Sequence, residues 1–398
     1  MKCDVLVVGA GPAGLASAIT TTKKGLKTIL IEKSSEIGYP VKTSAYTFKE
    51  VIDDWDLSEK VMSQWCNAFY VNSLHSNREI EVKFKKDIGG YLNYPKFLAE
   101  LSFKAIKNGT KILLSESASE PILDGDIVKG IMTKNNKEIH SKIVIDCSGP
   151  NATIGRKLNL LPKKEETEIG IGIEYEMSNV KVRNPKSIDF FVGQKEIVPI
   201  GYGWIFPLGA DRARIGICTV YNTLEILEEK NIKYWHERFL GKKSPIYPIV
   251  KNAQPYAIHS GAYPLSGMLE KPYANGLLLA GDSAAQASML VGEGIRYALE
   301  FGKSAGITAI ESFKSNDFSE DTLKSYVDKC YDYLGEYFDV AIDLLQVPTD
   351  EYWEGLIDAM INFKDTNPEN ILKYLKTEMT KQDAKNIFPS FVGKYLSQ

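Results

Sequence analysis

The amino-acid sequence predicts a protein of mixed α/β and α+β class, with a discontinuous α/β domain, an antiparallel-sheet domain and C-terminal helices. The first 33 residues alternate strand, glycine-rich turn, helix and strand, the order that builds parallel sheets. Four segments between residues 167 and 221 have the apolar or alternating pattern of strands. Residues 320–380 repeat apolar side chains at helical spacing.

Length and composition bound the class of protein. The chain has 398 residues, enough for two or three domains, and its net charge of −3 gives no reason to expect a nucleic-acid partner. The five cysteines lie far apart without metal-binding spacing, so we expect neither a bound metal nor disulfides. The apolar run near the N-terminus is too short to span a membrane. We expect a cytoplasmic protein and leave open a contact with the membrane surface.

A strand–turn–helix–strand unit opens the chain. We expect strands at residues 5–8 and 28–31, where β-branched residues cluster, and a helix at residues 13–22, whose small side chains allow close packing. The turn between the first strand and the helix carries the pattern GxGxxG, and the second strand ends on Glu32. This context makes the motif a strong indication of a Rossmann-like dinucleotide-binding domain.

Each residue of this motif has a separate physical task. Gly9 makes the tight turn, Gly11 lets a pyrophosphate approach the backbone, and Gly14 lets the helix pack closely on the strand. The helix N-terminus faces the phosphate charge, and the Glu32 carboxylate accepts a hydrogen bond from a ribose hydroxyl. The motif alone does not separate FAD from NAD.

A second segment decides for a flavin. A short apolar strand at residues 277–280 ends in Gly-Asp, and Gly292 and Gly294 then open a helix. Asp282 suits the ribityl hydroxyls, with a helix N-cap as the alternative. The helix N-terminus at Gly294 and Ile295 suits the negative charge of a reduced isoalloxazine. Between the two segments, a strand at residues 143–145 leads to Asp146 and Gly149, and Arg156 follows on a helix.

These segments together resemble the geranylgeranyl reductase family, flavoproteins related to the aromatic hydroxylases. The resemblance rests on "GDSAAQASMLVGEGIRYALEFGKSAG", "IEKSSEIGYPVK" and "GYGWIFPLG" and covers about residues 1–310. It implies FAD as cofactor and the saturation of isoprenoid C=C bonds in a prenyl lipid or prenyl quinone, by hydride from reduced flavin N5. The expected cofactor-binding residues are Gly9, Gly11, Ala13, Gly14, Glu32, Lys33, Asp282, Gly292, Gly294 and Ile295.

The stretch "GYGWIFPLG" is the family-specific part of the resemblance. Its alternating aromatic residues put three rings on one face of a strand, which as a pattern alone favours ordinary core packing. The resemblance implies instead an apolar tunnel that Gly203 keeps open, with Tyr202, Trp204, Phe206 and Pro207 as substrate-binding residues. Tyr202, Trp204 and Thr43 are the candidate catalytic residues. Tyr202 is either a proton donor or a structural hydroxyl.

The sequence departs from the family pattern at three places. Thr43 stands where many members have a cysteine, and a hydroxyl cannot reproduce thiol chemistry. Tyr94 stands where the family pattern has an arginine, and "SMLVGEG" lacks the proline that precedes the glycine-rich helix in many relatives.

We expect the FAD-binding domain at residues 1–65, 95–160 and 268–315. The substrate-binding sheet domain then comprises residues 66–94 and 161–267, and residues 316–398 form a C-terminal helical region. Of the four histidines, His140 falls in an exposed hairpin, whereas His259 precedes the return to the FAD domain and is a candidate for the interface.

No second nucleotide-binding motif follows the first, so we expect an external electron donor, either ferredoxin or NADPH. Two other functions stay open. A flavin monooxygenase of the aromatic-hydroxylase type shares the fold and the Gly-Asp segment. A non-catalytic carrier of prenyl lipids would explain the substitutions at Thr43 and Tyr94.

Overall fold

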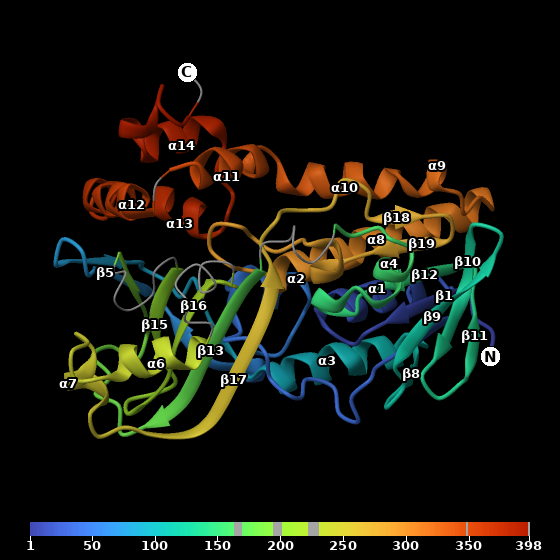
Figure 1. Ribbon diagram of the computed structural model, residues 1–398, viewed down its shortest axis with the longest axis horizontal. Helices are drawn as coiled ribbons and strands as arrows, with labels where there is room; N and C mark the ends of the chain where they lie inside the picture. Colours follow the sequence, from blue (N-terminus) through green and yellow to red (C-terminus); the bar gives the residue numbers. More distant parts are fainter. Residues whose placement is uncertain (163–168, 194–200, 222–230, 348, 397–398) are drawn as a thin grey trace. The chain divides into compact units, whose positions relative to one another are not determined.

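The computed structural model describes residues 1–162, 169–193, 201–221, 231–347 and 349–396. The chain divides into two compact units (Figure 1). The first unit consists of Met1–Val41, Asn93–Thr167 and Tyr263–Tyr333, and the second of Lys42–Leu92, Glu168–Ala262 and Leu334–Gln398. The division predicted from the sequence places the first change of domain at residue 66 and keeps residues 316–398 together.

The first unit is built on a six-stranded sheet. Its strands are, in spatial order, β18 (Tyr273–Ala274), β19 (Leu277–Leu279), β12 (Ile143–Asp146), β1 (Val5–Val8), β2 (Thr28–Ile31) and β8 (Lys111–Leu113). All neighbours are parallel except β18 and β19. The predicted strands of the first unit are confirmed, and the α/β class with them. Each of these strands is four residues or shorter, and most are fully buried, as parallel strands require.

Helix α1 (Pro12–Thr22) connects β1 to β2 and packs against α3 (Tyr94–Lys107) and α8 (Ile295–Ser315). The small residues of α1 explain this packing. A side chain at Gly302 of α8 would lie 2.2 Å from the Ala13 carbonyl oxygen, and Ser17 donates a hydrogen bond to the Gly302 carbonyl. The other elements of this unit are β9 (Ala118–Asp124), β10 (Ile127–Thr133), β11 (Glu138–His140), α4 (Thr153–Lys157), α9 (Glu320–Leu323) and α10 (Ser325–Leu334), which ends one residue into the second unit.

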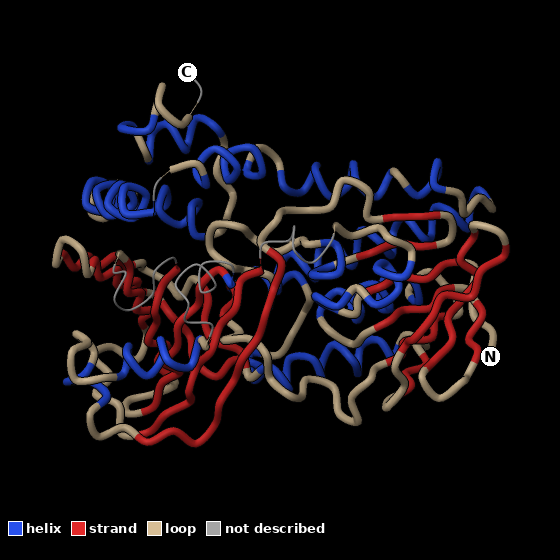
Figure 2. Tube along the Cα trace, viewed as in Figure 1, coloured by secondary structure: helices blue, strands red, loops and turns tan. Residues whose placement is uncertain are grey.

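The second unit is built on a seven-stranded sheet, whose strands are red in Figure 2 like all strands of the chain. Its strands are, in spatial order, β17 (Gln254–Pro264), β13 (Ile169–Ser178), β16 (Arg212–Val220), β15 (Gly201–Pro207), β14 (Ser187–Val192), β5 (Ala68–Ser73) and β6 (Arg78–Lys83). The predicted antiparallel pairing holds for β13, β16, β15 and β14, whereas β14 and β5 run parallel. A smaller sheet consists of β3 (Tyr46–Phe48), β7 (Gly89–Leu92) and β4 (Met62–Cys66).

The two faces of the large sheet differ. On one face, which we call the helix-covered face, α6 (Ile232–Leu240) and α7 (Tyr247–Val250) bury a hydrophobic core that includes Ile205, Ile215 and Phe239. The opposite face, the aromatic face, carries Tyr202, Trp204 and Phe206. The remaining helices are α2 (Lys49–Asp54), α11 (Tyr337–Leu345), α12 (Thr349–Phe363), α13 (Pro368–Leu375) and α14 (Lys381–Ile387), and α12 contacts β5 and β6.

Candidate active site

The glycine-rich turn lies at the carboxyl end of β1. In the sheet, β1 lies between β12 and β2, so the chain connections on its two sides run in opposite directions, as they do where nucleotides bind in this class of fold. Gly9 has φ of 101°, and a side chain there would lie 2.4 Å from the Cys147 carbonyl oxygen. A side chain at Gly14 would lie 1.9 Å from the Gly9 carbonyl oxygen. At Gly11 nothing lies within 4 Å of the position that a side chain would take. Two of the glycines are therefore needed for packing, and the third borders open space.

The N-terminus of α1 suits an anion. Gly11 is its N-cap, Pro12 follows, and the first turn has neither a side-chain cap nor an acidic residue. The amides of Ala13 and Gly14 precede the first helical hydrogen bond, which joins the Leu15 amide to the Gly11 carbonyl at 3.0 Å. Their N–H groups and the positive end of the helix dipole are the donors that a pyrophosphate needs. The residues of this turn therefore fit FAD.

Glu32 directly follows β2, and its side chain forms hydrogen bonds with the glycine-rich turn and with the segment after β2. One carboxylate oxygen accepts a hydrogen bond from the Ala10 amide at 2.9 Å, and the other accepts one from the Ser34 amide at 2.9 Å. A carboxylate has further lone pairs, with which Glu32 can also accept a hydrogen bond from a ribose hydroxyl. The neighbouring Lys33 is exposed.

Asp282 and Tyr94 come from distant parts of the sequence to the same region. Asp282 lies in a short 3-10 turn (Gly281–Ala284) directly after β19, and burial raises its pKa to about 6. Burial, followed by the charges of Asp282 and Glu32, raises the pKa of the Tyr94 hydroxyl. The alternative role of Asp282 as a helix N-cap is wrong, because Ala280 caps the turn and Gly294 caps α8.

The N-terminus of α8 carries a residue that the sequence analysis missed. Gly292 has φ of 66°, Gly294 is the N-cap and Ile295 the first helical residue. Between the two glycines, Glu293 is buried, and its Oε1 accepts a hydrogen bond from the Arg296 amide at 2.8 Å. Burial raises the pKa of this carboxyl. A reduced flavin at this terminus would therefore share the positive end of the helix dipole with the Glu293 carboxylate. The sequence signal that could have indicated this role is an acidic residue directly before the N-cap glycine.

The three predicted rings form a row on the aromatic face. Their centroids are 5.9 Å apart between Tyr202 and Trp204 and 5.6 Å between Trp204 and Phe206. Trp204 and Phe206 are buried, with exposed fractions of 6% and 4%, and Phe206 stacks on the Tyr91 ring at 4.9 Å. Trp204 and Phe206 therefore both pack within the domain, whereas Tyr202, at the end of the row, is half-buried. Pro207, also buried, ends the strand.

The expectation that Gly203 keeps a tunnel open is wrong. Gly203 lies on the helix-covered face, and a side chain there would approach the Phe239 ring of α6 to 2.6 Å. Alternation along the strand puts Gly203 and Trp204 on opposite faces. Gly216, paired with Trp204 on β16, is the glycine that makes room on the aromatic face, since its side chain would lie 2.3 Å from the Trp204 ring.

Thr43 lies in the bend between Lys42 and Ala45 in the second unit. Its hydroxyl oxygen accepts a hydrogen bond from the Ala45 amide at 3.0 Å, and Ala45 has φ of 56°. The hydroxyl thus stabilises a tight turn.

All five cysteines are free and buried. Burial raises the pKa of Cys3 to about 11 and the pKa values of Cys66 and Cys330 to about 12. In the described parts of the chain no three His, Cys, Asp or Glu side chains gather into a metal site, and no helix is long and apolar enough to cross a membrane.

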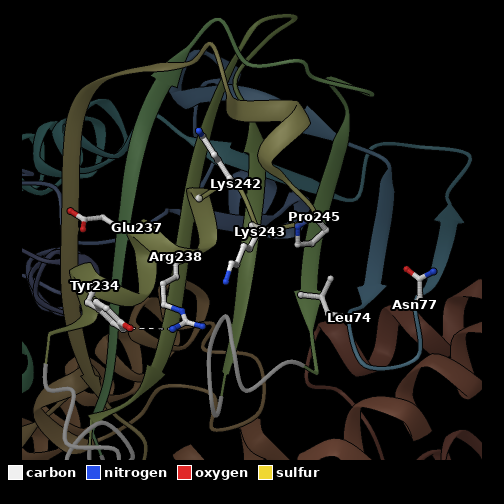
Figure 3. A pocket seen from close by; sticks show the side chains of 10 residues that line it. Leu74, Asn77, Tyr234, Glu237, Arg238, Lys242, Lys243 and Pro245 are labelled. Carbon is white, nitrogen blue, oxygen red and sulfur yellow. Dashed lines mark hydrogen bonds between the residues drawn. The ribbon is translucent and has the colours of Figure 1, made fainter.

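A pocket of about 930 Å³ opens beside α6 and holds none of the predicted site residues (Figure 3). Its lining residues are Leu74, Asn77, Tyr234, Glu237, Arg238, Gly241, Lys242, Lys243, Ser244 and Pro245. Arg238 donates a hydrogen bond to the Tyr234 hydroxyl at 3.1 Å. The pocket is cationic, because three basic side chains line it against one carboxylate, Glu237.

Two family models match successive parts of the chain. Residues 4–153 match the family model of FAD dependent oxidoreductases, and residues 167–257 match that of the geranylgeranyl reductase catalytic domain. The chain is 33% identical to the digeranylgeranylglycerophospholipid reductase of Methanocaldococcus jannaschii over 391 residues, 95% of each protein. It is 32% identical to digeranylgeranylglycerophospholipid reductase 3 of Methanosphaera stadtmanae, over 91% of each protein.

Solved structures show the same fold. A geranylgeranyl bacteriochlorophyll reductase-like protein from Thermoplasma acidophilum superposes with a TM-score of 0.83 at 26% identity, covering 98% of this chain and 99% of that one. A flavin-dependent brominase, at 18% identity and a TM-score of 0.76 over 99% of both chains, shares the fold alone. A turn that fits FAD and a similarity that extends over nearly the whole chain lead to one assignment: the chain belongs to the geranylgeranyl reductase family of FAD-dependent oxidoreductases.

Proposed function

We propose that this enzyme saturates isoprenoid C=C bonds of a prenyl lipid or prenyl quinone, and that the aromatic face of the second unit receives the chain. The observation that carries the proposal is the row of Tyr202, Trp204 and Phe206 on one sheet face, with two buried rings and the half-buried ring of Tyr202 at its end. This row lies within the segment that matches the geranylgeranyl reductase catalytic domain.

The chemistry explains why such a face is useful. An isolated trisubstituted alkene is not polarised, so it must take up a proton as well as a hydride, and positive charge develops on the more substituted carbon. Aromatic ring faces stabilise such charge by about 1–2 kcal/mol each when they are desolvated. They also exclude the water that would trap it.

The first unit holds the cofactor in this proposal. Bound FAD, once reduced, supplies the hydride. The Ala13 and Gly14 amides bind the pyrophosphate, Glu32 binds the ribose and Asp282 the ribityl chain, while Lys33, Gly292, Gly294 and Ile295 complete the predicted set. The proton donor in this proposal is Tyr202, the half-buried ring of the row, so Tyr202→Phe should reduce turnover while leaving flavin content unchanged.

The test is anaerobic. Dithionite-reduced, flavin-loaded protein is incubated with prenyl glycerolipids, prenyl phosphates and prenyl quinones, and mass spectrometry should detect gains of two hydrogens per double bond. Apoprotein with the same reductant is the control. A fully loaded, reduced protein that leaves every prenyl substrate unchanged would support the carrier function instead. Oxygen consumption coupled to hydroxylation would support the monooxygenase, which the family comparison does not favour.

The partners are also part of the proposal. Ferredoxin or NADPH provides the electrons, and flavin bleaching by each donor under anaerobic conditions distinguishes them. The exposed Lys242 and Lys243 at the cationic pocket support a contact with an anionic membrane surface. Sedimentation with anionic vesicles, compared with neutral ones, should weaken in a Lys242→Glu/Lys243→Glu variant. Equal sedimentation of variant and wild type would refute the contact at these lysines.

A further inference from the structure

A buried group of charged side chains lies directly beside the Trp204 ring. The Trp204 indole N–H donates a hydrogen bond to Glu174 Oε2 at 3.1 Å, across the one strand, β16, that lies between them. The other oxygen, Glu174 Oε1, lies 3.0 Å from His259 Nδ1 and 3.8 Å from Arg214 Nε. Glu174 has an exposed fraction of only 2%. The second imidazole nitrogen, His259 Nε2, lies 3.9 Å from Glu176 Oε2, so the ring lies between two carboxylates.

The same group reaches the segment that contains Thr43. Arg214 lies between two carboxylates, with its Nε 3.6 Å from Glu176 Oε1, and its Nη1 donates a hydrogen bond to the Ser44 carbonyl at 2.7 Å. A side chain at Gly261 of β17 would lie 2.2 Å from the Lys42 carbonyl oxygen. The bend that holds Thr43 is therefore fixed to the sheet by an arginine and by a close backbone approach.

Buried charge of this kind is not needed to stabilise a sheet. Removing a carboxylate from water is expensive, and apolar replacements of buried ion pairs are often as stable or more so. The group consists of two carboxylates, one guanidinium and one imidazole, and the carboxylate in contact with the indole N–H is that of Glu174. A hydrogen bond to an ionised acceptor is stronger than one to a neutral group, and it draws the N–H proton away from the ring. The ring face becomes richer in electrons and more attractive to a cation.

We propose that Glu174 is an electrostatic positioning residue of the reductase site, which orients the Trp204 indole and strengthens its attraction for positive charge developing on the substrate. The inference rests on the proposed function. Arg214 and His259 hold the Glu174 carboxylate in place, and Arg214 keeps the Thr43 bend against the same sheet.

The test is a double-mutant cycle on flavin-loaded protein. Glu174→Gln keeps an oxygen that accepts from the indole but removes the charge, and should lower kcat about tenfold with little change in KM. In a Trp204→Phe background, which has a ring but no N–H, adding Glu174→Gln should change kcat less than twofold. A full tenfold effect in that background would overturn the inference, as would a wild-type kcat in Glu174→Gln alone.

Asp189 on β14 provides a matched control. It is also buried in the same sheet, and it pairs with Arg183 at 3.0 Å and with the Ser187 hydroxyl at 2.7 Å. Asp189→Asn should therefore affect melting temperature much as Glu174→Gln does, but leave kcat per bound flavin unchanged. Equal losses of kcat in both variants would assign Glu174 a merely structural role.

A readout independent of turnover separates this inference from the proposed function. In ¹H–¹⁵N spectra, the indole signal that Trp204→Phe removes should move upfield in Glu174→Gln and stay in place in Asp189→Asn. An unmoved signal would overturn the inference even if prenyl reduction is observed. A wild-type protein that reduces no prenyl substrate would refute the proposed function but leave this spectral result intact.

Discussion

Two glycines of the phosphate-binding turn should respond to alanine in opposite ways. At Gly14 the new methyl group would lie 1.9 Å from the Gly9 carbonyl oxygen, well inside contact distance, so helix α1 must move away from the turn. Overpacking of this kind costs about 1–3 kcal/mol of unfolding free energy. At Gly11 the methyl group meets nothing within 4 Å, and the φ of −72° suits alanine. The loss of a glycine N-cap and the stiffer unfolded chain roughly offset each other, within about 0.5 kcal/mol.

For FAD affinity we expect the larger effect from Gly11→Ala, not from Gly14→Ala. The open space at Gly11 is where we expect the pyrophosphate, so Gly11→Ala should raise the Kd for FAD at least tenfold, about 1.4 kcal/mol, while the apoprotein stays as stable as wild type. Denaturant unfolding of the apoproteins and titration of FAD fluorescence measure the two quantities separately. Wild-type FAD affinity in Gly11→Ala would refute the placement of the phosphates, and wild-type stability in Gly14→Ala would refute the packing of α1.

Three further predictions concern stability, pH and thiols. Gly203→Ala should lower the unfolding free energy by about 1–3 kcal/mol because of the Phe239 ring, and Phe239→Leu should relieve part of that loss; additive losses in the double variant would contradict the packing. The pKa of Asp282 is raised from 3.8 to about 6, so the folded protein holds this proton more tightly, and the group's contribution to stability falls as pH rises from about 4 to about 6. The melting temperatures of wild type and Asp282→Asn, plotted against pH over this range, should show that fall for the wild type relative to the variant. A constant difference in melting temperature would contradict the prediction. The buried cysteines should react with a thiol reagent only after unfolding, when five thiols should titrate; rapid reaction of the native protein would show an exposed thiol.

Local features of the first unit were predictable because they depend on neighbours in the sequence. The strands around Val5–Val8 and Thr28–Ile31 and the glycine turn between them follow from short-range patterns of packing and turn chemistry. The carboxylate at Glu32 lies where the spacing predicts, although its hydrogen bonds to Ala10 and Ser34 show that it also shapes the turn.

Features of the second unit depend on contacts between distant residues, which periodicity does not encode. Alternation correctly predicted that Tyr202, Trp204 and Phe206 share a face. It did not predict which face of the sheet α6 covers. The space beside Gly203, which we expected to be open, is therefore filled by the Phe239 ring. Glu174 lies 30 residues from Trp204 and meets it only through the register of β13, β16 and β15. Its position within an alternating strand gave no sign that it faces inward.

The departures from the family pattern have consequences that the structure makes concrete. An arginine at the position of Tyr94 would place a cation near Asp282 and Glu32, and a cation lowers a carboxyl pKa. Tyr94 brings no positive charge, so the effect of burial on Asp282 is not offset, and its pKa rises to about 6. At the other departure, Thr43 brings a hydroxyl where many members of the family have a cysteine, and this hydroxyl accepts a hydrogen bond from the Ala45 amide. In the proposed reaction a donor other than a thiol at position 43 supplies the proton, and Tyr202, the half-buried ring of the row, is the donor to test first.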